Sequence, residues 1–168
     1  PQRDPFWRAL LRWQSFLPAG QVQADNGRTR SARLALRAEL GAALARENAD
    51  IPLNLLFLTG GDTTVRGYAY RSIGARTDSN QLYGGRYLAV GSVEWQRPIV
   101  HQGAFTDWES AVFIDAGAVS DHPETLTPRV GVGAGLRWRS PVGPLQADLA
   151  YGMHDRQLRL HLRMGFSF

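Results

Sequence analysis

Apolar and polar residues alternate with a period of two along most of the chain. The clearest segment lies at the C-terminus, where every second residue is apolar, in the order Leu158, Leu160, Leu162, Met164, Phe166, Phe168. The residues between them are polar, charged or small: Arg159, His161, Arg163, Gly165, Ser167. Because successive side chains of a β-strand point to opposite faces, this pattern predicts a strand with one wholly apolar face.

The same alternation recurs upstream and predicts about seven strands in all. The other segments are residues 7–14, 32–41, 87–96, 112–118, 129–139 and 145–152. The alternation is less clean in 87–96, where Leu88 and Val90 stand in the otherwise polar set. Residues 31–46 are rich in Ala, Leu, Arg and Glu, which are strong helix formers, so a helix is the alternative there. We favour a strand because the apolar residues recur at two, not at three and four.

Strands of roughly 9–13 residues are long enough to cross a bilayer when tilted. In a soluble sandwich the apolar face would form the core, whereas in a membrane barrel it would face lipid. The polar face mixes Gly with Arg, Glu and Asp, which suits a wet or plugged lumen. All five tryptophans fall on the apolar parity, and we expect them near strand ends as an aromatic girdle: Trp7, Trp13, Trp95, Trp108, Trp138. A soluble β-sandwich binding module is the alternative.

Composition narrows the class of protein further. The chain has 168 residues, begins with Pro and shows no signal peptide, so we expect an excised C-terminal fragment. No apolar run approaches the roughly 18 residues of a spanning helix, which excludes a helical membrane protein. Cysteine is absent, which excludes a disulfide scaffold and thiolate metal sites. The net charge is +4, but the basic residues are spread along the chain, so we expect no nucleic-acid partner.

About forty residues between Arg46 and Arg86 show no sustained alternation, and a connection of that length is usually functional or disordered. The centre of this segment reads TGGDTTVRGY over 59–68. By contrast, residues 140–144 and 153–157 read as short turns. Long loops of bacterial membrane barrels lie outside the cell. Counting back from a periplasmic C-terminus therefore places the long loop on the outer side.

Four motifs occur in the order of a known family: VRGY at 65–68, SVE at 92–94, FIDAG at 113–117 and WRSPVGP at 138–144. With these motifs and a terminal Phe168, the chain resembles the barrel of the outer-membrane assembly superfamily (bacterial surface antigen type). This superfamily includes BamA, TamA and the two-partner secretion transporters. The Gly60-Gly61-Asp62 segment and the arginine-rich turn look most like TamA, the translocation and assembly module subunit, with BamA second.

The resemblance implies an all-β fold in the outer membrane of a Gram-negative cell. Residues 1–168 would form the C-terminal part, about seven antiparallel strands, of a sixteen-stranded transmembrane β-barrel. The N-terminal strands and the periplasmic domains would lie outside the chain.

The resemblance also implies that the loop motif Val65, Arg66, Gly67, Tyr68 folds back into the barrel lumen, where Arg66 pairs with acidic residues on the inner wall. The alternation places Glu94 and Asp115 on that inward face, and one guanidinium can bind two carboxylates. Gly67 would let the backbone turn sharply, and Tyr68 would anchor on the wall. Taken singly, Arg66 is most often a solvated loop residue, Asp115 could be a lumen group without a partner, and Glu94 could pair with a neighbouring Arg.

The function that the resemblance implies is insertion or secretion of β-barrel clients, such as autotransporters, through a lateral seam beside the last strand. A client strand would pair with that strand by β-augmentation. The seam residues would be Leu158, Leu160, Leu162, Gly165 and Phe168. The implied partners are unfolded outer-membrane protein clients, the lipid bilayer and an inner-membrane-anchored partner subunit. A passive secretion channel of the two-partner type is the alternative.

The sequence gives no sign of an enzyme. Glycines at 131–135 lack the spacing of a dinucleotide fingerprint and lie in an alternating segment, and no Gly-x-Ser-x-Gly elbow occurs. The four histidines are scattered without metal-ligand spacing: His101, His122, His154, His161. We therefore expect no catalytic residue, no metal site and no cofactor.

Overall fold

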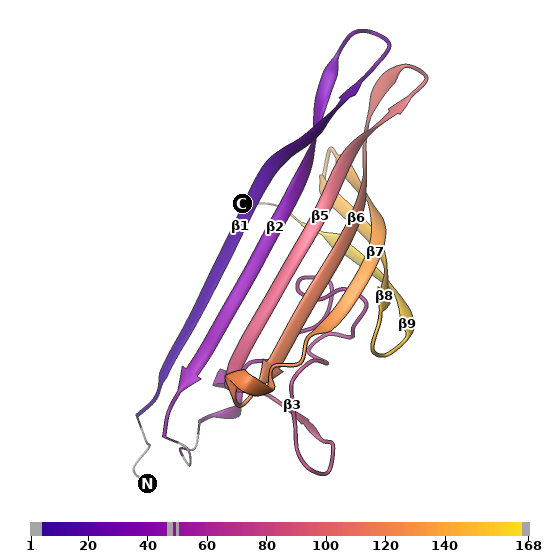
Figure 1. Ribbon diagram of the computed structural model, residues 1–168. Helices are drawn as coiled ribbons and strands as arrows, with labels where there is room; N and C mark the ends of the chain where they lie inside the picture. The colour runs from indigo at the N-terminus through magenta and orange to yellow at the C-terminus, as the bar shows by residue number, and fades with distance from the viewer. Residues whose placement is uncertain (1–4, 47–48, 50, 166–168) are drawn as a thin grey trace.

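The computed structural model describes residues 5–46, 49 and 51–165, and its main feature is a single antiparallel sheet of seven strands (Figure 1). Along the sheet the strands are β1 (Trp7–Gln23), β2 (Thr29–Leu44), β5 (Tyr87–His101), β6 (Ala104–Ser120), β7 (Arg129–Ser140), β8 (Gly143–Gly152) and β9 (Gln157–Met164). The long loop contributes a hairpin, β3 (Ala75–Arg76) with β4 (Leu82–Tyr83), and the 3₁₀ turn η1 (Leu53–Leu55). A second 3₁₀ turn, η2 (Pro123–Thr125), follows β6. Among the described residues, no helix is long and apolar enough to cross a membrane.

The seven predicted strands are all present, but their predicted lengths are wrong in several places. Residues 31–46 contain strand β2, so the helix alternative is wrong. β1 and β6 have 17 residues each, whereas β9 has eight. The first strand was expected to end near Gln14 but runs on to Gln23. The period of two fails at Ser15 and Phe16, although the pairing with β2 keeps its register as far as Pro18. The last ends at Met164, and residues 166–168 lie outside the described part of the chain.

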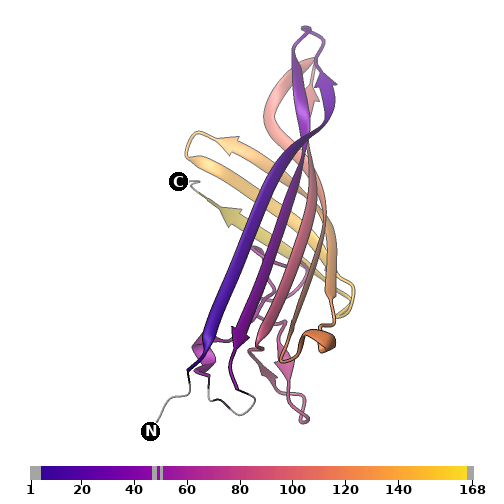
Figure 2. The same cartoon turned by 60° about the vertical axis from the view of Figure 1, so that its left-hand side comes forward.

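The sheet is strongly twisted and curved, and the long loop between β2 and β5 lies in the space that it partly encloses (Figures 1 and 2). At the end opposite the loop, the hairpins β1–β2 and β5–β6 extend beyond β7, β8 and β9 (Figure 1). The backbone N–H of Asp25 at one hairpin tip donates to the carbonyl of Gly103 at the other, at 3.0 Å. The curvature therefore gives the sheet an inner face that holds the loop and an outer face that is bare.

The outer face carries the apolar residues of the alternation, and they are exposed. Leu160, Leu162 and Met164 of β9 are 65%, 70% and 74% exposed, and β1 and β6 show the same pattern at Leu11 and Ile114. A soluble sandwich would bury these side chains in its core, so the sandwich alternative is wrong. A continuous apolar outer face is the arrangement expected of strands in contact with lipid.

The tryptophans all lie on this outer face or at its border, but not all at strand ends. Trp108 and Trp138 stack with their ring centroids 5.4 Å apart, near the start of β6 and the end of β7. Trp13 and Trp95 instead lie in the interior of β1 and β5. The expectation is wrong for these two because β1 and β5 run on to Gln23 and His101, well past the two tryptophans.

The inner face is partly apolar where the loop covers it. Leu88 and Val90 of β5 point inward and join a buried cluster with loop residues Phe57, Val65 and Tyr68. This contact explains why the alternation in 87–96 is less clean than elsewhere. The two apolar residues on the polar parity face the loop rather than water.

Candidate functional site

The centre of the loop is held in a tight turn before it reaches the wall. Gly60 and Gly61 adopt φ angles of +107° and +113°, which side chains other than glycine rarely adopt. The backbone N–H of Gly61 donates to the carbonyl of Val65 at 3.1 Å. From β2, Nη2 of Arg37 donates to the carbonyl of Thr64 at 2.7 Å. The turn therefore fixes the direction in which the VRGY segment enters the concave side of the sheet.

Arg66 lies in contact with both carboxylates that the alternation placed on the inner face. Its Nε and Nη2 donate to the two oxygens of Asp115 at 2.7 and 3.0 Å, and Nη1 donates to Glu94 Oε2 at 2.5 Å. The guanidinium carbon lies 3.4 Å from the centre of the Phe113 ring. Arg66 is 5% exposed, Glu94 7% and Asp115 0%, so these are buried ion pairs. The structure thus brings together the three residues that the sequence singled out.

Two further charged residues complete this network and were not predicted. Arg66 Nη1 also donates to Asp148 Oδ2 of β8 at 3.1 Å, and Arg137 of β7 bridges Asp148 and Glu94 at 2.5 and 2.8 Å. Asp148 and Arg137 both fall on the inward parity, so the alternation could have placed them on the correct face. Their contact depends on the register of β7 against β8, which pairs Gly135 with Asp148 and is not readable from the alternation.

The charge network consists of Arg66, Arg137, Glu94, Asp115 and Asp148, two cations and three anions. Burial by itself would lower the pKa of the Arg66 guanidinium, but the hydrogen bonds and charges of Asp115 and Glu94 raise that pKa above its ordinary value. Two neutral donors add to the network: Ser92 Oγ to Asp115 Oδ1 and Gln96 Nε2 to Glu94 Oε1, each at 2.6 Å. All three carboxylates are therefore engaged, and the arrangement holds the loop in place rather than presenting a free acid or base.

Inward-facing glycines let the loop backbone lie directly against the wall. A Cβ atom on Gly131 would lie 1.8 Å from the carbonyl oxygen of Arg66, and one on Gly152 would lie 2.5 Å from that of Gly67. Gly67 itself has a φ of +92°, and its own Cβ would lie 2.7 Å from the backbone nitrogen of Gly152. A side chain at any of these positions would push the loop away from β7 or β8.

Gly67 and Tyr68 extend the contacts toward the end of the sheet. The Tyr68 hydroxyl donates to the carbonyl of Val130 in β7 at 3.0 Å and accepts from the backbone N–H of His154 at 3.2 Å. The backbone N–H of Gly67 donates to Nε2 of His161 in β9 at 3.0 Å. The four motif residues therefore reach strands from β5 to β9 from within the curved sheet.

Three of the predicted seam residues, all leucines of β9, lie on the other side of the sheet from this network. Leu158, Leu160 and Leu162 form the exposed outer face of β9. Gly165 follows the end of β9, where its backbone N–H donates to the carbonyl of Pro144 at 3.1 Å. Phe168 lies outside the described residues. Among the described seam residues, the structure shows no hydrogen bond to the loop motif, and the role of all five in a seam stays a prediction.

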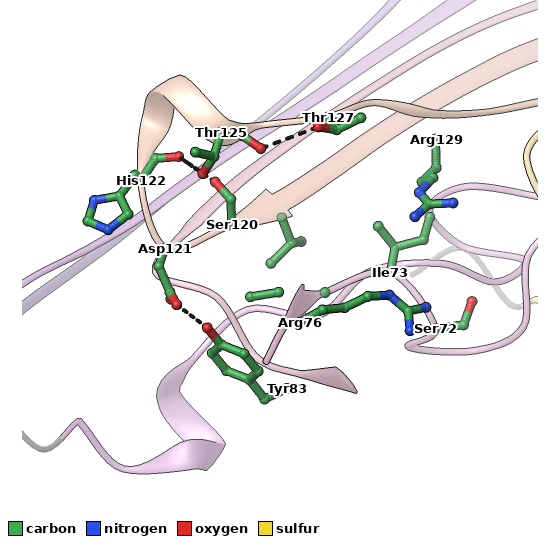
Figure 3. A pocket seen from close by; sticks show the side chains of 13 residues that line it. Ser72, Ile73, Arg76, Tyr83, Ser120, Asp121, His122, Thr125, Thr127 and Arg129 are labelled. Atoms are coloured by element: carbon green, nitrogen blue, oxygen red, sulfur yellow. Dashed lines mark hydrogen bonds between the residues drawn. The ribbon is translucent and has the colours of Figure 1, made fainter. Parts of the chain in front are cut away.

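A hollow of about 360 Å³ lies where the second half of the loop meets the connection after β6 (Figure 3). On one side the Tyr83 hydroxyl donates to the carboxylate of Asp121, and this hydrogen bond, more than burial, raises the pKa of Tyr83 to about 12. Arg76 and Arg129 also line the hollow (Figure 3). The Tyr83–Asp121 hydrogen bond attaches the β3–β4 hairpin to the end of β6. The loop is therefore attached to the sheet at a second place, in addition to the charge network.

Comparison with known proteins gives consistent relatives. Residues 3–168 match the model of the Omp85 superfamily domain. The chain is similar to the outer membrane protein assembly factor BamA of Nitratidesulfovibrio vulgaris, with 28% identity over 153 residues, which are 89% of this chain and 18% of that protein.

Among solved structures, the chain is similar to the crystal structure of BamA from Haemophilus ducreyi lacking POTRA domains 1–3. The TM-score is 0.66 at 19% sequence identity, covering 96% of this chain and 34% of that one. The chain spans well under half the length of either relative. The seven-stranded sheet thus resembles part of a BamA barrel, while the total of sixteen strands stays a prediction.

Proposed function

The chain belongs to the Omp85 superfamily, and from this premise we propose that the protein assembles β-barrel proteins in the outer membrane of a Gram-negative cell. Its location in the outer membrane follows from the family. Its partners would be unfolded outer-membrane protein clients and the lipid bilayer. The proposed role needs no catalytic residue, metal or cofactor, because folding of a client is driven by the client's own hydrogen bonds and burial.

The observation that carries this proposal is that the last strand, β9, is shorter than strand β6 under the loop and forms fewer backbone pairs. β9 has eight residues and pairs with β8 over its whole length, whereas β6 has 17 residues and pairs with long strands on both sides. Through the described residues of β9, a barrel that closes there forms a ladder of at most eight residues. A short ladder opens at lower cost than a long one, because each unpaired backbone group in lipid costs several kcal/mol. A client strand would pair with the edge so exposed.

Autotransporters are the clients that we propose first, with passage through the seam beside β9. The likeness to TamA that the WRSPVGP turn predicts, and the inner-membrane-anchored partner subunit that it implies, stay predictions. The two relatives described above are both BamA. A comparison of autotransporter and porin-type clients in one insertion assay would separate a TamA-like role from a BamA-like role.

A passive secretion channel is the second candidate, and one feature favours it. A cavity of about 640 Å³ opens on the inner face beside the loop, with Arg33, Arg37 and Arg163 in its lining. A polar cavity of this kind suits passage of an extended chain or of ions. Under the assembly proposal the same cavity would be lumen space next to the loop.

The test uses cysteine cross-linking, since the chain contains no cysteine of its own. The full-length protein would carry Leu162→Cys on the outer face of β9, or Leu149→Cys on the outer face of β8 as the matched control, since both side chains are exposed. A denatured client with one cysteine in its terminal strand would then insert into liposomes that contain each variant. We expect a disulfide to the client from position 162 and not from position 149.

Insertion of the client without a cross-link at Leu162 would contradict the seam, since a client strand paired with β9 must pass beside that side chain. Planar-bilayer conductance measured on the same preparation separates the two candidates. Ion conductance without any client insertion would support the passive channel and overturn the assembly proposal.

A further inference from the structure

One side chain of the last strand hydrogen-bonds to the loop. The backbone N–H of Gly67 donates to Nε2 of His161 at 3.0 Å, across 94 positions of sequence. Within the described part of the chain, Arg159 of β9 bonds to Gln157 of the same strand, and Arg163 bonds to Gln146 of β8. The contact of His161 therefore differs in kind, because it joins β9 to the element that the charge network holds in place.

The register of the sheet gives this contact its significance. His161 is paired with Asp148 of β8, and Asp148 binds Arg66 at 3.1 Å. Two consecutive loop residues, Arg66 and Gly67, thus bind two paired positions on neighbouring strands. If β9 slid along β8 or separated from it, the Gly67 bond would break while the bonds of Arg66 to β5, β6 and β8 stayed intact.

The chemistry of the bond sets strict requirements on residue 161. An imidazole accepts through Nε2 only when it is neutral and carries its proton on Nδ1. Gly67 is buried and its Cα faces the backbone of Gly152, so without an acceptor its N–H would be a poorly solvated, unpaired donor. An amide oxygen can replace the imidazole as acceptor, whereas an aliphatic side chain cannot.

We infer that His161 is a positioning residue that latches the last strand to the loop and so holds the seam closed until a client strand draws β9 away. The inference rests on the proposed lateral seam. The loop stays on the wall through the charge network in both states, and the Gly67–His161 bond forms only in the closed one. Release of β9 then breaks the Gly67–His161 hydrogen bond in addition to the backbone ladder and the Arg163–Gln146 bond to β8.

The experiment measures hydrogen exchange of the β9 amides in the full-length protein in lipid nanodiscs, without client. His161→Leu removes the acceptor, and His161→Gln supplies an amide oxygen in its place. We expect His161→Leu to speed exchange over 157–164 by roughly 2- to 10-fold, with β6 unchanged, and His161→Gln to restore the slow rate. Arg159→Gln is the matched control on the same face of β9, and its exchange is expected to equal that of the wild type.

Equal exchange in His161→Leu and wild type would overturn the latch, and so would a His161→Gln variant as fast as His161→Leu. Client insertion is measured separately on the same preparations. A wild type that inserts no client while its β9 exchange responds to His161→Leu would contradict the proposed function and leave the latch standing. A protein that inserts clients with unchanged exchange would contradict the latch alone.

Discussion

The strands under the loop and the last strand of the sheet are held by different means. β5, β6, β7 and β8 are joined from inside by the charge network, whose carboxylates Glu94, Asp115 and Asp148 are buried. β9 has a single neighbour among the described strands, an exposed outer face, and one side-chain hydrogen bond to the loop. The difference shows a sheet that is fixed firmly in its middle and weakly at its end.

This contrast follows from the inverted polarity of the sheet. The outer apolar face gains nothing by packing against other strands, since lipid is as apolar as its side chains. Contacts that hold the loop must therefore form on the inner face, where polar groups are available and the loop excludes water. Buried ion pairs stabilise only when their geometry is good and their remaining hydrogen bonds are satisfied. Asp115 meets this condition, with bonds to Arg66 and to Ser92.

The largest loss of stability in the strands under the loop is expected when Arg66, the cation at the centre of the charge network, is removed. Arg66→Ala leaves Glu94, Asp115 and Asp148 buried, and Arg137, the remaining cation of the charge network, contacts Glu94 and Asp148. Breaking a buried pair by removing one partner costs about 3–5 kcal/mol. We expect a loss of that size in the free energy of unfolding by urea, and loss of the heat-modifiable folded band on gels.

Arg66→Lys is the control for charge alone. A lysine keeps the positive charge but lacks the fork of donors that contacts both oxygens of Asp115. We expect it to recover only part of the stability. An Arg66→Ala variant with wild-type heat-modifiability would show that the loop is not held by this network.

A double-mutant cycle tests whether Arg66 and Asp115 act as one unit. Asp115→Asn combined with Arg66→Ala should cost less than the two single changes added, by up to about 3 kcal/mol, because each single change leaves the other partner unpaired. Urea titration of the four proteins gives the coupling energy. Strict additivity would mean that the two side chains do not interact in the folded protein.

A substitution at Gly131 tests the close packing of the loop against β7 without altering any charged residue. Gly131→Ala would place a Cβ 1.8 Å from the carbonyl oxygen of Arg66, so the backbone of the loop or of β7 must shift. We expect a cost of about 1–3 kcal/mol in the free energy of unfolding. Gly91→Ala in β5 is the control, because no atom lies within 4 Å of its added Cβ. Equal stability of the two variants would argue against close contact between loop and wall.

Much of this arrangement could be predicted from the period of two, and the rest depends on information that the period lacks. The alternation identified all seven strands and put Glu94 and Asp115 on the inner face, and the family motif pointed to Arg66 as their partner. It did not reveal Asp148 or His161 as loop contacts, since these depend on strand register and on the path of the loop. It also missed the ends of β1 and β5, because Ser15 and Phe16 break the alternation in β1 and a register shift beside Pro98 interrupts it in β5.

The smallest expected effect comes from Tyr68, which lies between the strands held by the charge network and the last strand, β9. Tyr68→Phe removes a buried hydroxyl that joins the carbonyl of Val130 in β7 to the backbone N–H of His154, in the turn before β9. We expect a loss of about 0.5–1.5 kcal/mol in the free energy of unfolding, with faster amide exchange in the turn at 153–156. Tyr70→Phe is the matched control two residues away, since Tyr70 is 75% exposed, and we expect it to change neither quantity measurably. If both variants behaved alike, the Tyr68 hydroxyl would contribute nothing to holding the end of the sheet, and the weak region would begin at β8 rather than at β9.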